Sequence, residues 1–180
     1  MGVAALVEAL AAARIGDTFN QYARAPHLRA RLAAYLEARS QADVLLVGEA
    51  AGYRGARISG LPFTSERQLT GSGPAEATAT IVQRTLAELG LTGRVLLWNV
   101  VPTHPHRRGA PHSNRPPTRA EAEAAAPYLA ELARGRRVVA VGRVAQSELA
   151  RARLGGEHVR HPSHGGATAF RDGLERLLLQ

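Results

Sequence analysis

The 180-residue sequence contains neither cysteine nor lysine. Without cysteine the chain can form no disulfide, no thiolate zinc site and no cysteine-held iron–sulfur cluster. No apolar run approaches the ~20 residues of a membrane-spanning helix. The apolar start, residues 1–14, contains Glu8 and lacks a basic segment, so we interpret it as an amphipathic helix rather than a signal peptide. We expect a cytoplasmic protein with no metal and no cofactor.

All 23 basic residues are arginines, and the formal net charge is +8. The arginine guanidinium is planar and suits phosphate, and a basic balance is typical of proteins that bind nucleic acid. A GC-rich genome also favours Arg and Ala codons, whatever the function of the protein. Charge alone therefore does not decide whether the protein binds nucleic acid.

The hydrophobic pattern predicts strands that alternate with helices. The expected strands are 43–48, 94–100, 137–141 and 157–161, and the expected helices are 3–14, 27–39, 75–89, 118–134, 143–153 and 168–179. Strands separated by helices of ten or more residues favour a parallel sheet that is covered on both faces. The sequence therefore predicts an α/β protein, three-layer α/β/α with a central, mostly parallel four-stranded sheet.

The length and the 45% hydrophobic content fit a single domain of residues 1–180. We expect residues 1–40 to form an N-terminal helical segment that packs on the α/β core. Nothing in the sequence calls for a second subunit, so a monomer is expected.

Unusual segments follow three of the four predicted strands. Residues 48–66 contain four glycines, residues 99–117 are rich in Pro and His, and residues 161–166 read His-Pro-Ser-His-Gly-Gly. We interpret the exit of the third strand, residues 142–148, as an ordinary helix entry. Ligands of open parallel sheets bind beyond the carboxyl ends of the strands, so the three specialised segments predict one composite site.

These segments carry motifs in a fixed order: Gly-Glu-Ala-Ala-Gly at 48–52, Gly-Leu-Pro-Phe at 60–63, the strand-end Asn99 and His-Pro-Ser at 161–163. The ordered set resembles the motifs of the uracil-DNA glycosylase superfamily, over about residues 44–166. It is most similar to bacterial branches related to the thermostable iron–sulfur type, although the cluster cysteines are absent. The resemblance implies a DNA glycosylase that removes uracil or a related deaminated base and so initiates base excision repair. The absence of lysine for a Schiff base favours a monofunctional enzyme.

The resemblance implies a role for each matching residue. Gly48, Glu49 and Ala50 would line the pocket near the attacked sugar carbon, with Glu49 as the candidate general base. Phe63 would stack on the extruded base. Asn99 would pair with the uracil edge, because its amide presents a donor and an acceptor together.

His161 would donate a hydrogen bond to uracil O2 as negative charge develops on the leaving base. This chemistry needs a base flipped out of the stack and preorganised donors for an anion. We also expect the glycines at 48, 52, 55 and 60 to let the DNA backbone approach closely.

Two departures from the family pattern affect catalysis and specificity. Ala50 stands where some branches place Asp or Asn to activate water, which favours the alternative of a non-catalytic binder of nucleic acid. Gly52 aligns with the bulky Tyr that excludes thymine in the most selective branch. Tyr53 is adjacent, and the sequence leaves open whether it replaces that function.

The basic, Pro-stiffened loop 101–117 predicts contacts with phosphate groups. The residues expected to contact DNA are Ser65, Arg107, Arg108, Arg115, Ser163, His164 and Gly165. A loose likeness of residues 111–117 to a branch that traps uracil covalently would nominate His112 as a nucleophile.

Each candidate also has an ordinary interpretation. Glu49 is compatible with a solvated loop carboxylate, Phe63 with a core residue, Asn99 with a cap and His161 with a structural histidine. The histidines of the Pro-rich loop invite a metal site, but His-Pro-His is not a helical i, i+4 pair and no carboxylate stands at ligand spacing. A nucleotide-handling α/β protein is a further alternative, although no Walker motif or GxGxxG is present.

Overall fold

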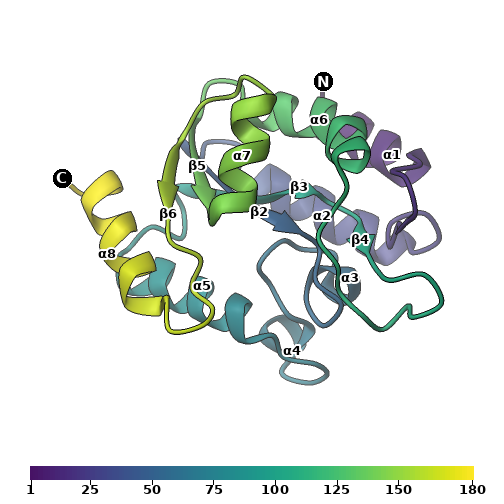
Figure 1. Ribbon diagram of the computed structural model, residues 1–180, viewed down its shortest axis with the longest axis horizontal. Helices are drawn as coiled ribbons and strands as arrows, with labels where there is room; N and C mark the ends of the chain where they lie inside the picture. Colours follow the sequence, from purple (N-terminus) through teal and green to yellow (C-terminus); the bar gives the residue numbers. More distant parts are fainter.

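A computed structural model describes all 180 residues (Figure 1). The central strands are β2 (Val44–Ala50), β3 (Val95–Val101), β5 (Arg137–Val141) and β6 (Glu157–Val159). They form one parallel sheet in the order β3-β2-β5-β6. The helices are α1 (Val3–Ala12), α2 (Pro26–Ala38), α3 (Ala56–Ser59), α4 (Glu66–Thr70), α5 (Ala77–Glu88), α6 (Arg119–Ala133), α7 (Arg143–Arg151) and α8 (Ala167–Leu178). None has both the length and the apolar character that a membrane crossing requires.

The sheet lies between two layers of helices, so the predicted fold class is confirmed (Figure 1). Alternate residues of each strand point to opposite faces. On one face Leu45 and Val47 of β2 belong to a buried cluster with α1, α2, α6 and α7. On the other face Val44 and Leu46 belong to a cluster with α5 and α8. The near-continuous apolar runs of the strands follow from this burial on both faces.

One side chain of α2 protects the β3 edge of the sheet. Tyr35 of α2 reaches this edge, and the backbone N–H of Leu97 donates to its hydroxyl oxygen at 2.8 Å. Burial raises the pKa of Tyr35 to about 12. An edge strand with a free N–H invites pairing with another chain, so this hydroxyl protects the edge while it packs the N-terminal segment on the core.

The structure adds elements that the pattern does not predict. β1 (Thr18–Phe19) and β4 (His104–Pro105) pair as a short antiparallel ribbon. The short helices α3 and α4 interrupt the glycine-rich segment after β2. Elements of two to five residues are too short for hydrophobic periodicity to reveal.

The strand order sets the position of the site. β2 lies inside the sheet, and the chain leaves it to form β3 on one side and returns to form β5 on the other. Such a switch of direction opens a crevice at the carboxyl ends of the strands. In register, Gly48 of β2 stands beside Asn99 of β3, so two predicted site residues meet there.

Candidate functional site

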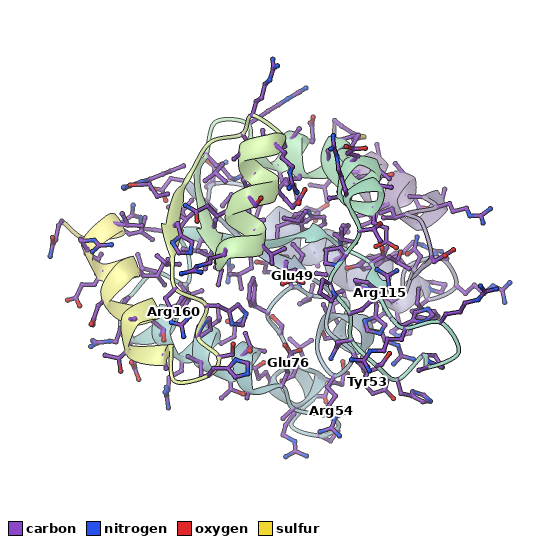
Figure 2. All side chains as sticks on the ribbon, viewed as in Figure 1. Glu49, Tyr53, Arg54, Glu76, Arg115 and Arg160 are labelled. Carbon is purple, nitrogen blue, oxygen red and sulfur yellow. The ribbon has the colours of Figure 1, made fainter.

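A cavity of about 430 Å³ opens at this edge of the sheet. It is bounded by the ends of β2 and β3, by the start of α5 and by the segment after β6. Figure 2 shows Glu49 and Glu76 on opposite sides of it. Its lining includes Glu49, Ala50, Gly52, Phe63, Glu76, Asn99, Asn114, Arg115, His161, Ser163 and His164. Residues of all four motifs, together with Glu76, Asn114 and Arg115, therefore form one composite site.

Gly48 allows the aromatic and amide groups of the cavity to approach each other. A Cβ at position 48 would lie 2.3 Å from Phe63 Cζ and 2.7 Å from Asn99 Oδ1. Phe63 adopts a φ of +49°, which is strained for a non-glycine residue. The Gln83 side-chain amide donates to the Phe63 carbonyl at 3.1 Å and supports this conformation. The ring position is thus imposed by its surroundings.

The Asn99 side chain is nearly buried, at 4% exposure, and it lines the cavity. Its amide forms no hydrogen bond within the protein. Its amide atoms reach the open cavity rather than being sealed in the core. An unpaired amide that faces a cavity is therefore ready for a ligand with a matching donor and acceptor.

His161 is fixed by the residue two positions further along the chain. The Ser163 backbone N–H donates to His161 Nδ1 at 3.2 Å, and the Ser163 hydroxyl lies 2.7 Å from the same nitrogen. Because Nδ1 accepts a hydrogen bond, the ring proton of the neutral imidazole is on Nε2. Burial, with smaller contributions from His164 and Arg160, lowers the pKa of His161. Its Nε2–H is left free to donate.

Two carboxylates without partners complete the cavity. Burial raises the pKa of Glu49 and also that of Glu76, and no hydrogen bond or ion pair offsets either shift. Raised carboxylate pKa values in a cleft are typical of functional sites. The sequence singles out Glu49 but not Glu76, because Glu76 lies 27 positions further along the chain and enters the cavity only through the start of α5.

The glycines of the loop after β2 accommodate the protein's own side chains, which corrects the expectation that they admit the DNA backbone. A Cβ at Gly52 would lie 2.9 Å from Glu76 Oε2, and one at Gly55 only 1.8 Å from it. Gly60 has a φ of +74° and ends α3 in the left-handed conformation. Packing and helix termination, rather than a bound phosphate, explain these glycines.

Residues 35–176 match the family model of the Uracil DNA glycosylase superfamily, which covers most of the chain. The protein belongs to this superfamily. It is also similar to a solved structure described as wild-type Pedobacter heparinus SMUG2, with a TM-score of 0.73 and 13% sequence identity. That alignment covers 99% of this chain and 97% of the other, and at such low identity it shows the fold alone. No curated protein matches the chain.

The residues that the sequence predicts to contact DNA differ from one another in exposure and in pairing. Arg107 and Arg108 are exposed, and neither forms an ion pair. Arg115 lines the cavity, but its guanidinium donates to both Glu121 oxygens, at 2.8 and 2.6 Å, and to the His106 carbonyl at 2.9 Å. Arg115 therefore braces its own loop, and its contact with phosphate stays a prediction.

The other predicted contacts also divide by exposure. Ser65 is fully buried and caps α4 in a capping box with Gln68, so its side chain presents no surface. Ser163, His164 and Gly165 form the partly exposed turn after His161. Tyr53 lies outside the cavity lining. The centroid of its ring is 5.1 Å from that of His112, and the two rings pack edge to face. Tyr53 is thus not placed against the cavity in this structure.

The exit of β5 also contributes to the site, unlike the ordinary helix entry that the sequence suggests. Gly142, Arg143 and Val144 line a second hollow of about 440 Å³ that shares Glu49 and His161 with the cavity. A Cβ at Gly142 would lie 3.2 Å from His161 Cβ, and this glycine has a φ of +86°. The signal that could have revealed this segment is the glycine between a strand and a helix.

The histidines of the Pro-rich loop do not assemble a metal site. No three His, Asp or Glu side chains come together where they could hold a metal ion. His104 is buried in β4, and its Nδ1 donates to the Ala51 carbonyl at 2.8 Å. His112 is exposed and is not part of the cavity lining. His104 therefore holds the loop after β2 to the loop after β3.

Proposed function

We propose that the protein is a monofunctional DNA glycosylase that excises uracil or a related deaminated base. The observation that carries this proposal is the unpaired Asn99 amide in a cavity that also contains Phe63 and the free Nε2–H of His161. An aromatic face with a donor–acceptor edge and a separate donor matches a flipped pyrimidine. Superfamily membership supports the same reaction class.

In the proposed reaction the base leaves the stack and enters the cavity between Phe63 and the amide of Asn99. Stacking on an aromatic ring contributes about 1–3 kcal/mol. The bond between sugar C1′ and base N1 breaks, and its electron pair moves to the base as an oxocarbenium-like sugar forms. His161 Nε2–H donates to the developing anion at O2. Preorganised donors of this kind are usually the largest catalytic contribution.

Glu49 has the chemistry to complete the hydrolysis. Its half-buried carboxylate has no partner, and burial raises its pKa. In the proposal it orients a water molecule and accepts its proton while the water oxygen forms the new bond to C1′. The products are a free base and an abasic site.

The basic residues around the cavity fit a strand of DNA. Arg143 and Arg160 line the hollow on the far side of Glu49, and Arg107 and Arg108 are free on the loop after β4. Figure 2 shows Arg160 and Arg115 on opposite sides of the cavity. In the proposal the exposed arginines hold phosphates, and the protein acts on DNA as a monomer in the cytoplasm.

A non-catalytic DNA-binding protein with the same cavity is the second candidate. Ala50 lines the cavity with a methyl group and supplies no water-activating side chain, and this observation favours the alternative. Covalent capture through His112 would need that exposed ring to reach the cavity.

Incubation with labelled strands that contain one uracil, single- and double-stranded, tests all three functions. Strand scission after alkali, at least about a hundredfold slower with His161→Ala than with the wild type, supports the glycosylase. Binding without scission supports the non-catalytic protein. An adduct that survives denaturant and disappears in His112→Ala supports covalent capture, and a strand neither bound nor cleaved overturns the assignment to DNA.

A further inference from the structure

Two hollows of the surface meet near Glu76. Glu76 and Gly52 line the cavity that contains Asn99. Their immediate chain neighbours, Ala75 and Tyr53, line a groove of about 480 Å³ together with Arg54 and Arg67. The boundary between cavity and groove therefore passes beside Glu76. In the view of Figure 2, Glu76 lies between Glu49 and Arg54.

The wall between the two hollows is a carboxylate packed on glycines. Glu76 Oε2 occupies the position that a Cβ would take at Gly55, and it approaches the corresponding position at Gly52. Glu76 precedes the first turn of α5, but its side chain makes no capping hydrogen bond. The positive end of the helix favours a negative charge there. The carboxylate is thus held in the wall without being neutralised by a partner.

The two sides of this wall differ in charge. In the groove, Arg54 forms no ion pair, and Arg67 donates only to the Gly73 carbonyl, at 3.0 Å. In the cavity, Glu49 and Glu76 are unpaired, and the one guanidinium, that of Arg115, is held by Glu121. A phosphate is therefore attracted to the groove and repelled from the cavity, while a neutral base meets no such barrier in the cavity.

We propose that Glu76 is a specificity-determining residue that sorts the parts of a nucleotide: it admits a neutral base to the cavity, keeps phosphate in the groove, and limits the size of the base. This inference deepens the proposed function and rests on it. Glu76 performs the two tasks with different properties of its side chain. Its charge excludes phosphate, and its volume closes the space that Gly52 and Gly55 leave open.

Two substitutions separate charge from volume. Glu76→Gln keeps the size of the side chain and removes the charge, whereas Glu76→Ala removes both. Glu88→Gln, at the other end of the same helix on an exposed surface, is the matched control. The probes are uracil, thymine and inorganic phosphate, followed by NMR at the Asn99 side-chain amide in the cavity and at the Arg54 backbone amide by the groove. This readout needs no catalysis.

In the wild type and in Glu88→Gln, we expect uracil to move the Asn99 resonance and phosphate to move only that of Arg54. In Glu76→Gln, phosphate should also reach Asn99, with at least about tenfold tighter binding there, because like-charge repulsion is gone. In Glu76→Ala, thymine binding should also rise about tenfold relative to uracil, the usual discrimination for one methyl group.

The proposal is overturned if phosphate stays away from Asn99 in both Glu76 variants and the thymine-to-uracil ratio does not change. It is also overturned if uracil fails to move the Asn99 resonance of the wild type. A wild type that binds uracil at Asn99 but releases no base from DNA would instead contradict the glycosylase function. Should Glu76→Ala fail to fold, Glu76→Gln still tests the exclusion of phosphate.

Discussion

The wall of the cavity and the loop after β3 contain similar polar residues, but the two regions use them differently. In the loop, Arg115 is bound to Glu121 and to carbonyls, and His104 is bound to Ala51. In the cavity, the Asn99 amide and the Glu49 carboxylate have no protein partner. Paired groups hold a scaffold, whereas unpaired groups at a cavity are available to a ligand. The type of a polar residue therefore does not show whether it holds the scaffold or is available to a ligand, whereas its hydrogen-bond pairing does.

Loss of Arg115 should give the largest effect, and it should be an effect on stability. Arg115→Met leaves the Glu121 side chain, only 3% exposed, without its guanidinium. Breaking a buried pair in this way costs about 3–5 kcal/mol of the free energy of unfolding. Urea denaturation measures the loss, and activity per folded molecule should change little. Arg119→Met, which breaks an exposed pair with Glu123, should change stability by less than about 1 kcal/mol.

If Arg115→Met keeps its stability but loses DNA binding, Arg115 contacts DNA and does not brace its loop. Such a result would break the comparison between the two regions, because pairing would then not identify the scaffold.

His161→Ala should lower the chemical step by about 10²–10³, the usual loss of one oxyanion-type donor. Single-turnover rates on a uracil-containing strand, with DNA saturated by enzyme, isolate this step from binding. Ser163→Ala is the matched comparison. It should lose less than about tenfold, because the backbone N–H of Ser163 still holds Nδ1. Wild-type rates in His161→Ala would remove this residue from the catalytic site.

Asn99→Ala should lower activity on uracil by about tenfold to a hundredfold, since the hydrogen bonds to the base edge are lost. Affinity for undamaged DNA should hardly change. Asn99→Asp should also impair uracil recognition, because an ionised carboxylate supplies no donor. Equal losses in uracil excision and in binding of undamaged DNA would instead assign Asn99 to the scaffold.

Removing the charges of Arg107 and Arg108 should weaken DNA binding, and the loss of affinity should be largest at low salt. The slope of log K against log salt should become shallower by about 1 for each arginine that contacts a phosphate, with base preference unchanged. Titrations at several salt concentrations measure it. An unaltered slope would show that the loop after β4 does not contact DNA.

The smallest effect should be a gain of stability in Glu49→Gln. A carboxyl whose pKa is raised in the folded state stabilises the fold below its unfolded pKa, near 4.5, and loses that contribution as the pH rises through the folded value. At pH 7 the buried charge therefore costs stability. Glu49→Gln should raise the Tm at pH 7 by about 2 °C, a modest shift because solvent screens a half-exposed group, and the gain should vanish below about pH 4.

Glu121→Gln is the opposite case. Burial would raise the pKa of Glu121, but hydrogen bonds from Arg115 and Thr118 hold it below its ordinary value. Its contribution to stability is present above the unfolded pKa and is lost as the pH falls, so Glu121→Gln should lower the Tm at pH 7. If both variants shift the Tm in the same direction, pairing does not distinguish the two carboxylates.

Much of the fold follows from local pattern. The strand predicted at 137–141 is β5 without any change of bounds, and Thr118 and Glu121 form the predicted capping box, with Thr118 N–H donating to Glu121 at 2.8 Å. Strand periodicity and capping depend on residues a few positions apart, and such neighbours are fixed by the chain itself. The ordered motifs also predicted the superfamily. They identified Glu49, Asn99 and His161, which the structure places in one cavity.

The sequence by itself therefore determined the alternation of strands and helices, the parallel sheet and the edge at which the site forms. Only the tertiary structure decided which polar groups are paired: that Glu121 holds Arg115, and that Glu76 rests on Gly55 and faces the cavity. These contacts join segments whose distance depends on the path of each loop and on the strand order. A pattern within one segment contains no information on that distance, so the roles of these residues could not be predicted before the segments were packed together.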